Sequence, residues 1–214
     1  MRRIIYILAN VILSAIIFAS CSGVDEENTV NGFEYVDLGL PSGTKWAASN
    51  IGAKVPESTG SYFAWGEISE SNYTEAECET CNLSVSDLTK HEIIKSLRLT
   101  ADYDAATYNM GIGWQTPTKQ QYEELKTNCT WIWQDKPSRY KIVAKNGKSI
   151  FLPTTGYMSD GRNLNYANQG FYWTSEVESG SSKNAIRLGF PSNEYNIKSY
   201  YRDGGRCIRS VTLK

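Results

Sequence analysis

The feature that most constrains this chain lies at its start, where an apolar run leads into a cysteine. Arg2 and Arg3 precede the apolar residues 4–19, and Ser20 stands directly before Cys21. A basic start, a short apolar segment and a small-residue cleavage pattern are typical of a secretory signal peptide. The sequence therefore predicts that residues 1–20 are a signal peptide and that the rest of the chain folds outside the cytoplasm.

The last four residues of this region, FASC (residues 18–21), resemble a lipobox, in which lipoprotein signal peptidase cleaves before a diacylglyceryl-bearing cysteine. We therefore predict that Cys21 is the lipidation site and that the membrane is a partner through this anchor. Each buried methylene contributes about 0.8 kcal/mol, so several acyl chains hold a domain at a membrane. Two alternatives stay open: an ordinary signal peptide followed by an incidental cysteine, and a transmembrane anchor, which needs roughly 20 apolar residues.

The residues that follow Cys21 bear on where the protein is sent. The residue after Cys21 is Ser22 rather than Asp, which resembles the pattern of lipoproteins sorted to the outer membrane. The acidic residues 25–27 resemble the acidic tag of some surface-exported lipoproteins. The predicted location is the outer membrane of a Gram-negative bacterium, with a lipid anchor at the cell surface. Residues 21–32 are polar without apolar periodicity, which predicts a flexible tether before a domain at 33–214.

Composition limits the classes of partner. The net charge is -1 and the sequence pI is near 5.9, with Lys and Arg scattered along the chain. Such a chain lacks the basic footprint of a nucleic-acid-binding protein, so we expect no nucleic-acid partner. Hydrophobic residues make up 41% and aromatic residues 12% of the sequence, which is sufficient for the core of one domain.

Four cysteines follow Cys21, and an exported chain makes disulfides the default for them. They are Cys78, Cys81, Cys129 and Cys207. Four cysteines allow three connectivities; we prefer Cys78 with Cys81 as a local bond and Cys129 with Cys207 as a long-range bond. A zinc site at Cys78 and Cys81 is the competing interpretation, but the sequence has no second CxxC to complete four ligands.

Helix signals are few. Thr118 is followed three residues later by Gln121, the pattern of a capping box, which predicts a helix that begins there and ends near Cys129. Residues 102–108 predict a short helix before a glycine break. Residues 67–99 are polar and irregular, which predicts a surface insertion with one weakly helical stretch at 88–97.

Strand signals fill the rest of the chain. Residues 33–38 alternate apolar and polar side chains, and residues 45–51 follow a turn sequence. Asn146 and Gly147 separate residues 140–145 from 149–152, a strong two-residue hairpin signal. Further strands are predicted at 170–177, 184–190 and 206–213. Together these predict an α+β fold, with an antiparallel sheet, one or two helices and long loops.

Seven segments, in order, resemble a known family. They are EYVDLGLPSGTKWA (34–47), YFAWGE (62–67), WQTPT (114–118), NCTW (128–131), IFLP (150–153), GFYWTS (170–175) and GRCIRSV (205–211). They resemble the Fibrobacter succinogenes major paralogous domain family, which has the C-type lectin-like fold. The resemblance implies this fold for residues 33–214, with GRCIRSV as the closing strand. It does not imply one activity, because the fold hosts lectins, enzymes and adhesins.

Catalytic and metal-binding patterns are incomplete in the sequence. The calcium lectin triplets EPN, QPD and WND do not occur, and one carboxylate in residues 159–165 makes a poor cation cage. The only histidine, His91, opens an HExxH-like pattern whose second ligand position is Lys95. We therefore expect no metal, no cofactor and no catalysis. A formylglycine-generating type of enzyme is a lesser alternative implied by the fold.

The segment before the last predicted strand is rich in tyrosine and asparagine, which provide rigid contact area and adaptable hydrogen bonds. The predicted ligand-binding residues are Asn193, Tyr195, Asn196, Tyr200 and Tyr201. We expect a non-catalytic module for adhesion or recognition that binds a glycan or a protein. The alternative is a structural envelope lipoprotein without a ligand site. Exposure of these rings favours binding, and their burial favours the structural alternative. Trp173 and Tyr172, by contrast, are expected in the core.

Overall fold

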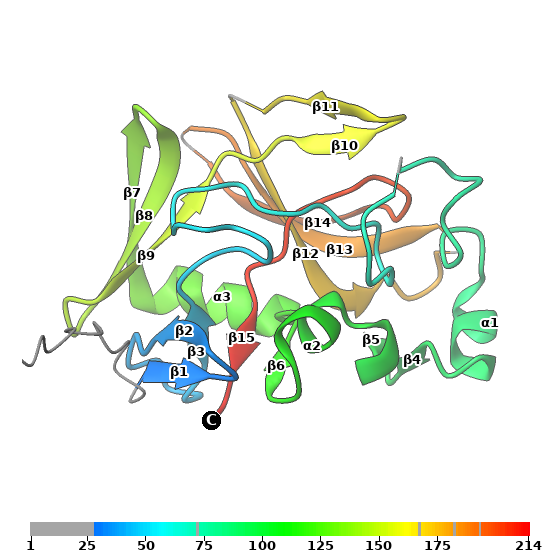
Figure 1. Cartoon of the computed structure of the whole chain (residues 1–214), viewed down its shortest axis with the longest axis horizontal. Helices are drawn as coiled ribbons and strands as arrows, with labels where there is room; N and C mark the ends of the chain where they lie inside the picture. Colours follow the sequence, from blue (N-terminus) through cyan, green and yellow to red (C-terminus); the bar gives the residue numbers. More distant parts are fainter. Residues whose placement is uncertain (1–27, 72, 167, 182, 193) are drawn as a thin grey trace, which may run out of the picture.

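The computed structural model describes residues 28–71, 73–166, 168–181, 183–192 and 194–214, and in this part every pairing of named strands is antiparallel. The sheets are accompanied by three α-helices (Figure 1), α1 (Val85–Lys90), α2 (Ala105–Met110) and α3 (Lys119–Asn128). This confirms the predicted α+β class. Cys21 and the whole predicted signal peptide lie outside the described residues.

A five-stranded sheet forms the centre of the described fold, in the order β14-β13-β12-β5-β4. Its strands are β14 (Asn196–Tyr201), β13 (Asn184–Phe190), β12 (Gly170–Val177), β5 (Arg98–Leu99) and β4 (Ile94–Lys95). The strands predicted at 170–177 and 184–190 are confirmed. Strand β14 was not predicted as a strand, although it includes most of the predicted binding segment.

Strand β12 separates two hydrophobic clusters, because it is buried on both faces. On one face, Trp173 packs with Trp65 and Trp114 in the first cluster. On the other, Tyr172 packs with Tyr122 and Leu125 of helix α3 in the second cluster. Both β12 residues are 1% exposed or less, which confirms that they belong to the core. Burying such large rings on both faces fixes the register of β12, since a one-residue slip would exchange the two sets.

A second five-stranded sheet brings the two ends of the described chain together. Its order is β1 (Thr29–Val30), β2 (Phe33–Val36), β3 (Lys45–Ala47), β15 (Val211–Thr212) and β6 (Trp114–Gln115). Strand β1 lies within the predicted tether of residues 21–32, and its residues Thr29 and Val30 pair with β2. Strand β15 is shorter than predicted at 206–213, and its neighbours upstream make only isolated bridges.

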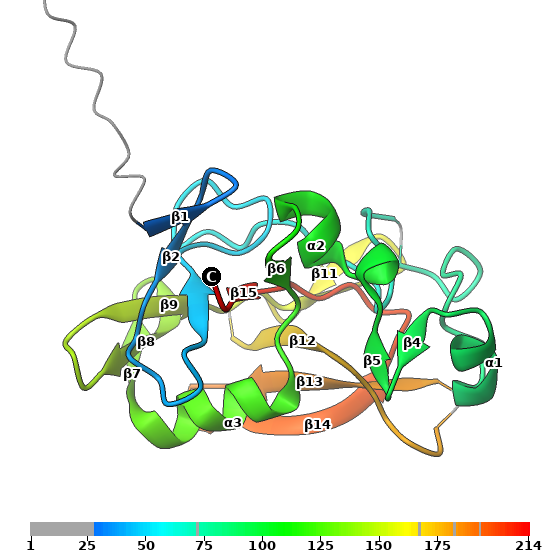
Figure 2. The same ribbon diagram turned by 90° about the horizontal axis from the view of Figure 1, so that it is seen from below.

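A three-stranded sheet continues from helix α3, with β7 (Cys129–Asp135), β8 (Ser138–Ala144) and β9 (Ser149–Pro153). The predicted hairpin is confirmed: Gly147 has a φ of 81°, which glycine adopts without a steric penalty, and its amide donates to Ala144. Strand β7 was not predicted. A separate hairpin, β10 (Tyr157–Ser159) and β11 (Arg162–Leu164), lies at the end of the molecule away from β1 and the C-terminus (Figures 1 and 2).

The predicted helix starts are set by local capping. Thr118 accepts a hydrogen bond from the Gln121 amide, and the Gln121 side chain accepts one from the Thr118 amide, so the capping box before α3 is confirmed. The short helix expected at 102–108 forms as α2, where Asp104 accepts from the Ala106 amide. Capping by a buried carboxylate shifts the start of this helix to residue 105.

The predicted surface insertion at 67–99 is more integrated than expected. Helix α1 begins after Ser84 and ends before His91, earlier than the predicted stretch at 88–97. The following strands β4 and β5 then extend the central sheet beside β12. The physical reason is burial, because Leu88, Ile93 and Ile94 join the cluster around Trp173.

One of the two preferred disulfides forms. Cys78 and Cys81 are bonded, as predicted. Cys129 and Cys207 are free thiols in the structure, so the preferred long-range pair is not present. Their surroundings differ: Cys129 pairs with Ala144 on the β7–β8 hairpin, while Cys207 lies against Tyr172 on β12.

Candidate ligand-binding site

The structure divides the predicted binding residues among different surroundings. Tyr195 is half-buried, and its ring stacks on Trp131 at 4.4 Å between centroids. Asn196 and Tyr200 line one cavity, and Tyr201 lines another. Neighbouring residues of a strand point to opposite faces, which is why Tyr200 and Tyr201 separate. Asn193 lies outside the described residues.

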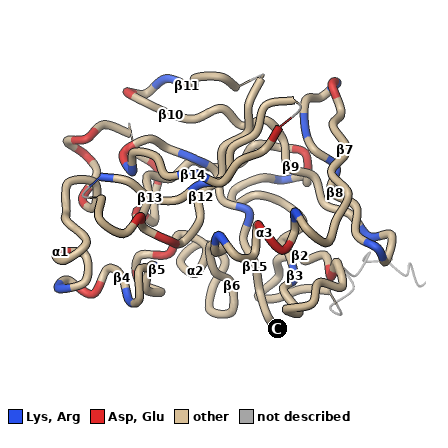
Figure 3. Tube along the Cα trace, turned by 180° about the vertical axis from the view of Figure 1, so that it is seen from behind, with Lys and Arg blue, Asp and Glu red and all other residues tan. Residues whose placement is uncertain are grey.

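The cavity at Asn196 and Tyr200 has a volume of about 270 Å³ and lies on the central sheet beside the hairpin β10–β11. Its lining includes four aromatic residues, three amides and two arginines, namely Tyr157, Phe171, Phe190, Tyr200, Asn165, Gln169, Asn196, Arg187 and Arg206. We call this space the arginine cavity. Basic positions lie in the middle of the β12–β14 sheet, beneath the β10–β11 hairpin (Figure 3).

Arg187 is the first unusual residue of the arginine cavity. Its side chain projects from β13, and the residue is only 8% exposed. Nε and Nη1 are buried and have no hydrogen-bond partner among the described residues. The guanidinium lies between two rings, with Cζ 4.3 Å from the centroid of Phe171 and 4.6 Å from that of Tyr200. These cation–π contacts offset part of the cost of burying the charge but satisfy no N–H group.

Arg206 approaches the same cavity from the chain segment before β15 and is 2% exposed. Its Nη1 donates to the carbonyl oxygens of Tyr201 and Gly204, at 3.0 and 2.9 Å. Its Nε has no partner among the described residues. The guanidinium lies over Trp173 at 4.2 Å and reaches Tyr200 at 5.1 Å, so one tyrosine ring contacts both cations.

The local sequence explains how β13 accommodates a buried arginine. Strand register places Phe171 opposite Gly189 and Trp173 opposite Arg187, all on the face that looks toward the cavity. A Cβ atom at Gly189 would overlap Nη1 of Arg187. Because Gly189 has no side chain, the Arg187 guanidinium can occupy the space beside its Cα atom. Gly170 makes room in a similar way for the ring of Phe190.

The electrostatics of the arginine cavity are strongly cationic. Burial lowers the pKa of Arg187 to about 10, and burial together with repulsion from Arg187 lowers the pKa of Arg206 to about 9. Both groups stay protonated at neutral pH. In the described part of the chain, the ion pairs join Arg98 with Glu176, Arg139 with Glu57 and Lys183 with Glu75. Neither cavity arginine forms one of these ion pairs, although Asp203 lies close enough to Arg206 to raise its pKa.

The cavity also presents an unused acceptor. Oδ1 of Asn196 is buried and lacks a hydrogen-bond partner in the described part of the chain. Buried polar atoms without partners are uncommon in folded proteins, and each one calls for an explanation such as a ligand or water. The three residues that carry these atoms, Arg187, Arg206 and Asn196, all line the arginine cavity.

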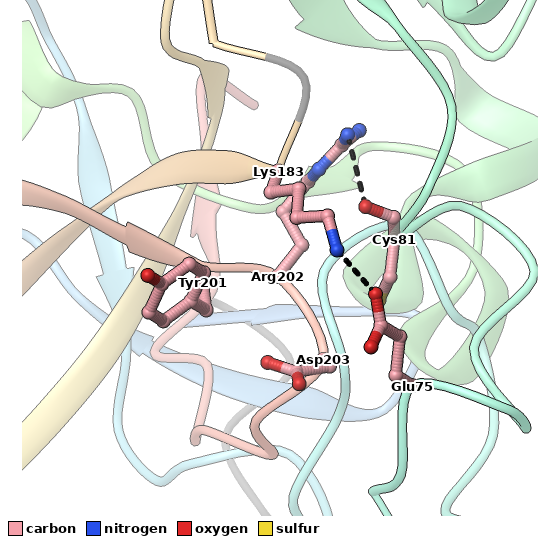
Figure 4. A pocket seen from close by; sticks show the side chains of 6 residues that line it. All are labelled: Glu75, Cys81, Lys183, Tyr201, Arg202 and Asp203. Atoms are coloured by element: carbon pink, nitrogen blue, oxygen red, sulfur yellow. Dashed lines mark hydrogen bonds and ion pairs between the residues drawn. The ribbon is translucent and has the colours of Figure 1, made fainter.

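A second cavity of about 330 Å³ lies at the other face of β14 and is lined by Tyr201, Lys183 and Asp203. Figure 4 shows interactions for two of its cationic side chains, Lys183 and Arg202. Lys183 forms an ion pair with Glu75, and Arg202 donates to the carbonyl oxygen of Cys81, next to the disulfide. Because Lys183 and Arg202 already have partners, this cavity is the weaker candidate for a ligand.

The HExxH-like segment does not form a helix that could align ligands. His91 is the C-cap of α1 and is exposed, and Lys95 lies in strand β4. Among the described residues, no three His, Cys, Asp or Glu side chains gather in a way that could hold a metal ion. In the same part of the chain, no helix has the length and apolar character needed to cross a membrane.

Comparisons of the chain with protein-family models, with curated proteins and with solved structures find no match.

The two cavity arginines were missed by sequence reasoning, which concentrated on tyrosine and asparagine. One signal was present: in residues 184–190, NAIRLGF, Arg187 takes the same face as Ala185 and Gly189. A charged residue at an inward position of a strand with small neighbours indicates a buried cation. For Arg206 no comparable local signal exists, because its surroundings come from distant segments.

Proposed function

We propose that this chain is a lipid-anchored, cell-surface lipoprotein whose C-type lectin-like domain binds a ligand in the arginine cavity without catalysis. The observation that carries the proposal is the set of buried, unpartnered polar atoms on Arg187, Arg206 and Asn196. Such atoms lower stability unless something pairs with them.

The size of the arginine cavity favours a small glycan epitope over a protein surface. Its volume of about 270 Å³ is close to the lower end of ligand pockets. A stable protein partner would instead need roughly 800 Å² of contact on each side. Tyr200 is 44% exposed at the cavity, as the binding hypothesis expects. The partial burial of Tyr195 is what the structural alternative expects, but Tyr195 lies away from the cavity.

The lectin-like fold is supported by the family resemblance and by the position of the closing segment. GRCIRSV leads into β15, which pairs with β3 near the start of the described chain. The lipid anchor is supported by the FASC segment and Cys21 alone. A Cys21→Ser variant should fail to incorporate labelled palmitate and should leave the membrane fraction. Retention of both properties by the variant would refute the anchor.

A glycan array tests the binding function directly. Full-length chain in detergent micelles should bind a subset of glycans, and a Tyr200→Ala variant should lose most of the signal. Tyr195→Phe, which keeps the stacking on Trp131, is the matched control and should bind like the wild type. An array without any signal, or equal signals for wild type and Tyr200→Ala, would contradict the proposed function.

A further inference from the structure

The unused groups of the arginine cavity specify a ligand more narrowly than its volume does. The donors are Nε and Nη1 of Arg187 and Nε of Arg206, and the acceptor is Oδ1 of Asn196. A ligand that satisfies all of them must carry an anionic acceptor group and, beside it, at least one hydroxyl or N–H donor. A simple anion satisfies the arginines only.

Guanidinium groups bind carboxylates well, because two parallel N–H groups match the two carboxylate oxygens. The bond is stronger in a buried site, where water does not compete. Arg187 lines the arginine cavity, and its Nε and Nη1 have no hydrogen-bond partner among the described residues. Arg206 adds a second cation that is held in place by the Tyr201 and Gly204 carbonyls.

The remaining walls suit a sugar ring. Tyr157 and Tyr200 provide aromatic surface, and Asn165 and Gln169 provide amides at the rim. Aromatic faces with a few placed polar groups are typical of small-molecule sites. We propose that the arginine cavity binds a carboxylate-bearing sugar, such as a uronic acid residue, with the carboxylate on Arg187 and Arg206 and a hydroxyl group donating to Asn196.

This inference rests on the proposed function and can fail separately from it. Calorimetry on the full-length chain in detergent should detect binding of D-glucuronate or D-galacturonate. The neutral sugars D-glucose and D-galactose, and acetate, should each bind at least 10-fold more weakly. Inorganic sulfate, inorganic phosphate and an aspartate-rich peptide are the competing anions and should also bind more weakly.

Two variants locate the site. Arg187→Met removes the cation and should lower uronate affinity about 50-fold, since hydrogen bonds between charged groups are the strong ones. Gly189→Ala keeps both arginines but places a methyl group where Nη1 lies, so it should lower affinity by a similar factor. Arg162→Met removes an exposed charge from β11 outside the cavity lining and should leave affinity unchanged. Circular dichroism checks that each variant is folded.

The outcomes separate the two ideas. Uronate binding that Arg187→Met and Gly189→Ala weaken, but Arg162→Met does not, supports the inference. Array binding of neutral glycans without uronate binding overturns the inference and leaves the proposed function standing. Sulfate, phosphate or the peptide binding as tightly as uronate overturns the inference, as does unchanged affinity in folded Arg187→Met. An array with no signal and no uronate binding overturns both.

Discussion

Two buried arginines, three residues apart in the last segment of the chain, have opposite surroundings. Arg209 donates to Asn50, Ala47, Ala48 and Pro56, so each of its nitrogens has an acceptor. Arg206 shares the cavity with Arg187, where N–H groups stay unpartnered among the described residues. The same residue type thus fixes the fold in one place and leaves bonding capacity unused in the other. Both kinds of arginine are buried, so burial does not distinguish them. The number of guanidinium nitrogens that have a hydrogen-bond acceptor does.

The largest expected effect follows from removing Arg209. Arg209→Met leaves carbonyl groups of residues 47–56 without their donor, and we expect a loss of about 4 kcal/mol in the free energy of unfolding. Urea denaturation followed by tryptophan fluorescence measures this. Arg209→Lys should also destabilise, because an ammonium lacks the planar fork that reaches several acceptors. A loss below about 1 kcal/mol for Arg209→Met would break the comparison.

An intermediate effect is expected for Arg206. Arg206→Met removes the two hydrogen bonds from Nη1 to the Tyr201 and Gly204 carbonyls and the contact with Trp173, so the free energy of unfolding should fall by about 2 kcal/mol. The same urea titration gives the value. Arg98→Met, which removes a half-exposed ion pair, is the control and should change stability by no more than about 0.5 kcal/mol. A loss equal to that of Arg209→Met would show that the count of satisfied donors does not set the ranking.

Arg187 should have the smallest effect of the three. Replacing a buried charge that has no partner with an apolar side chain is often neutral or stabilising, so Arg187→Met should change the free energy of unfolding by about 0 to +1 kcal/mol. Thermal unfolding in the absence of ligand measures it. A destabilisation as large as that of Arg209→Met would mean that Arg187 is structural and would remove the reason to expect a ligand.

Cys207 lies between Arg206 and Arg209 in the sequence, so the reactivity of its thiol reports how tightly this segment is packed. It is fully buried, and burial raises the pKa of its thiol well above the usual range. Iodoacetamide labelling followed by mass spectrometry should modify half-buried Cys129 first and Cys207 only after unfolding. Labelling of Cys207 as fast as Cys129 would mean that the segment around Arg206 and Arg209 opens readily.

Much of the central sheet was predictable because its signals are local. Strands β12 and β13 are apolar runs bounded by Gly, Ser and Asn, and the capping box before α3 needs only residues 118 and 121. Strand β14 is difficult to predict because it lies at the edge of its sheet and is rich in polar and partly exposed residues, among them Lys198, Ser199 and Tyr200. Such a strand resembles a polar surface loop in sequence.

The binding site was only partly predictable. Asn196 and Tyr200 were expected from the tyrosine and asparagine content, and they line the arginine cavity. Tyr195 was assigned to the same surface, but it stacks on Trp131 of β7, a strand that was not predicted. Arg206 depends on carbonyls and rings that folding brings together from several elements, and no sequence pattern records that arrangement.

Strand β1 determines how the domain would stand on a lipid bilayer. It lies at the end of the molecule that carries the C-terminus, opposite the hairpin β10–β11 beside the cavity (Figure 1). The seven residue steps from Cys21 to Asn28 span at most about 25 Å. With acyl chains on Cys21, the proposed anchor would attach to the domain at the end that carries β1, opposite the hairpin β10–β11 beside the cavity.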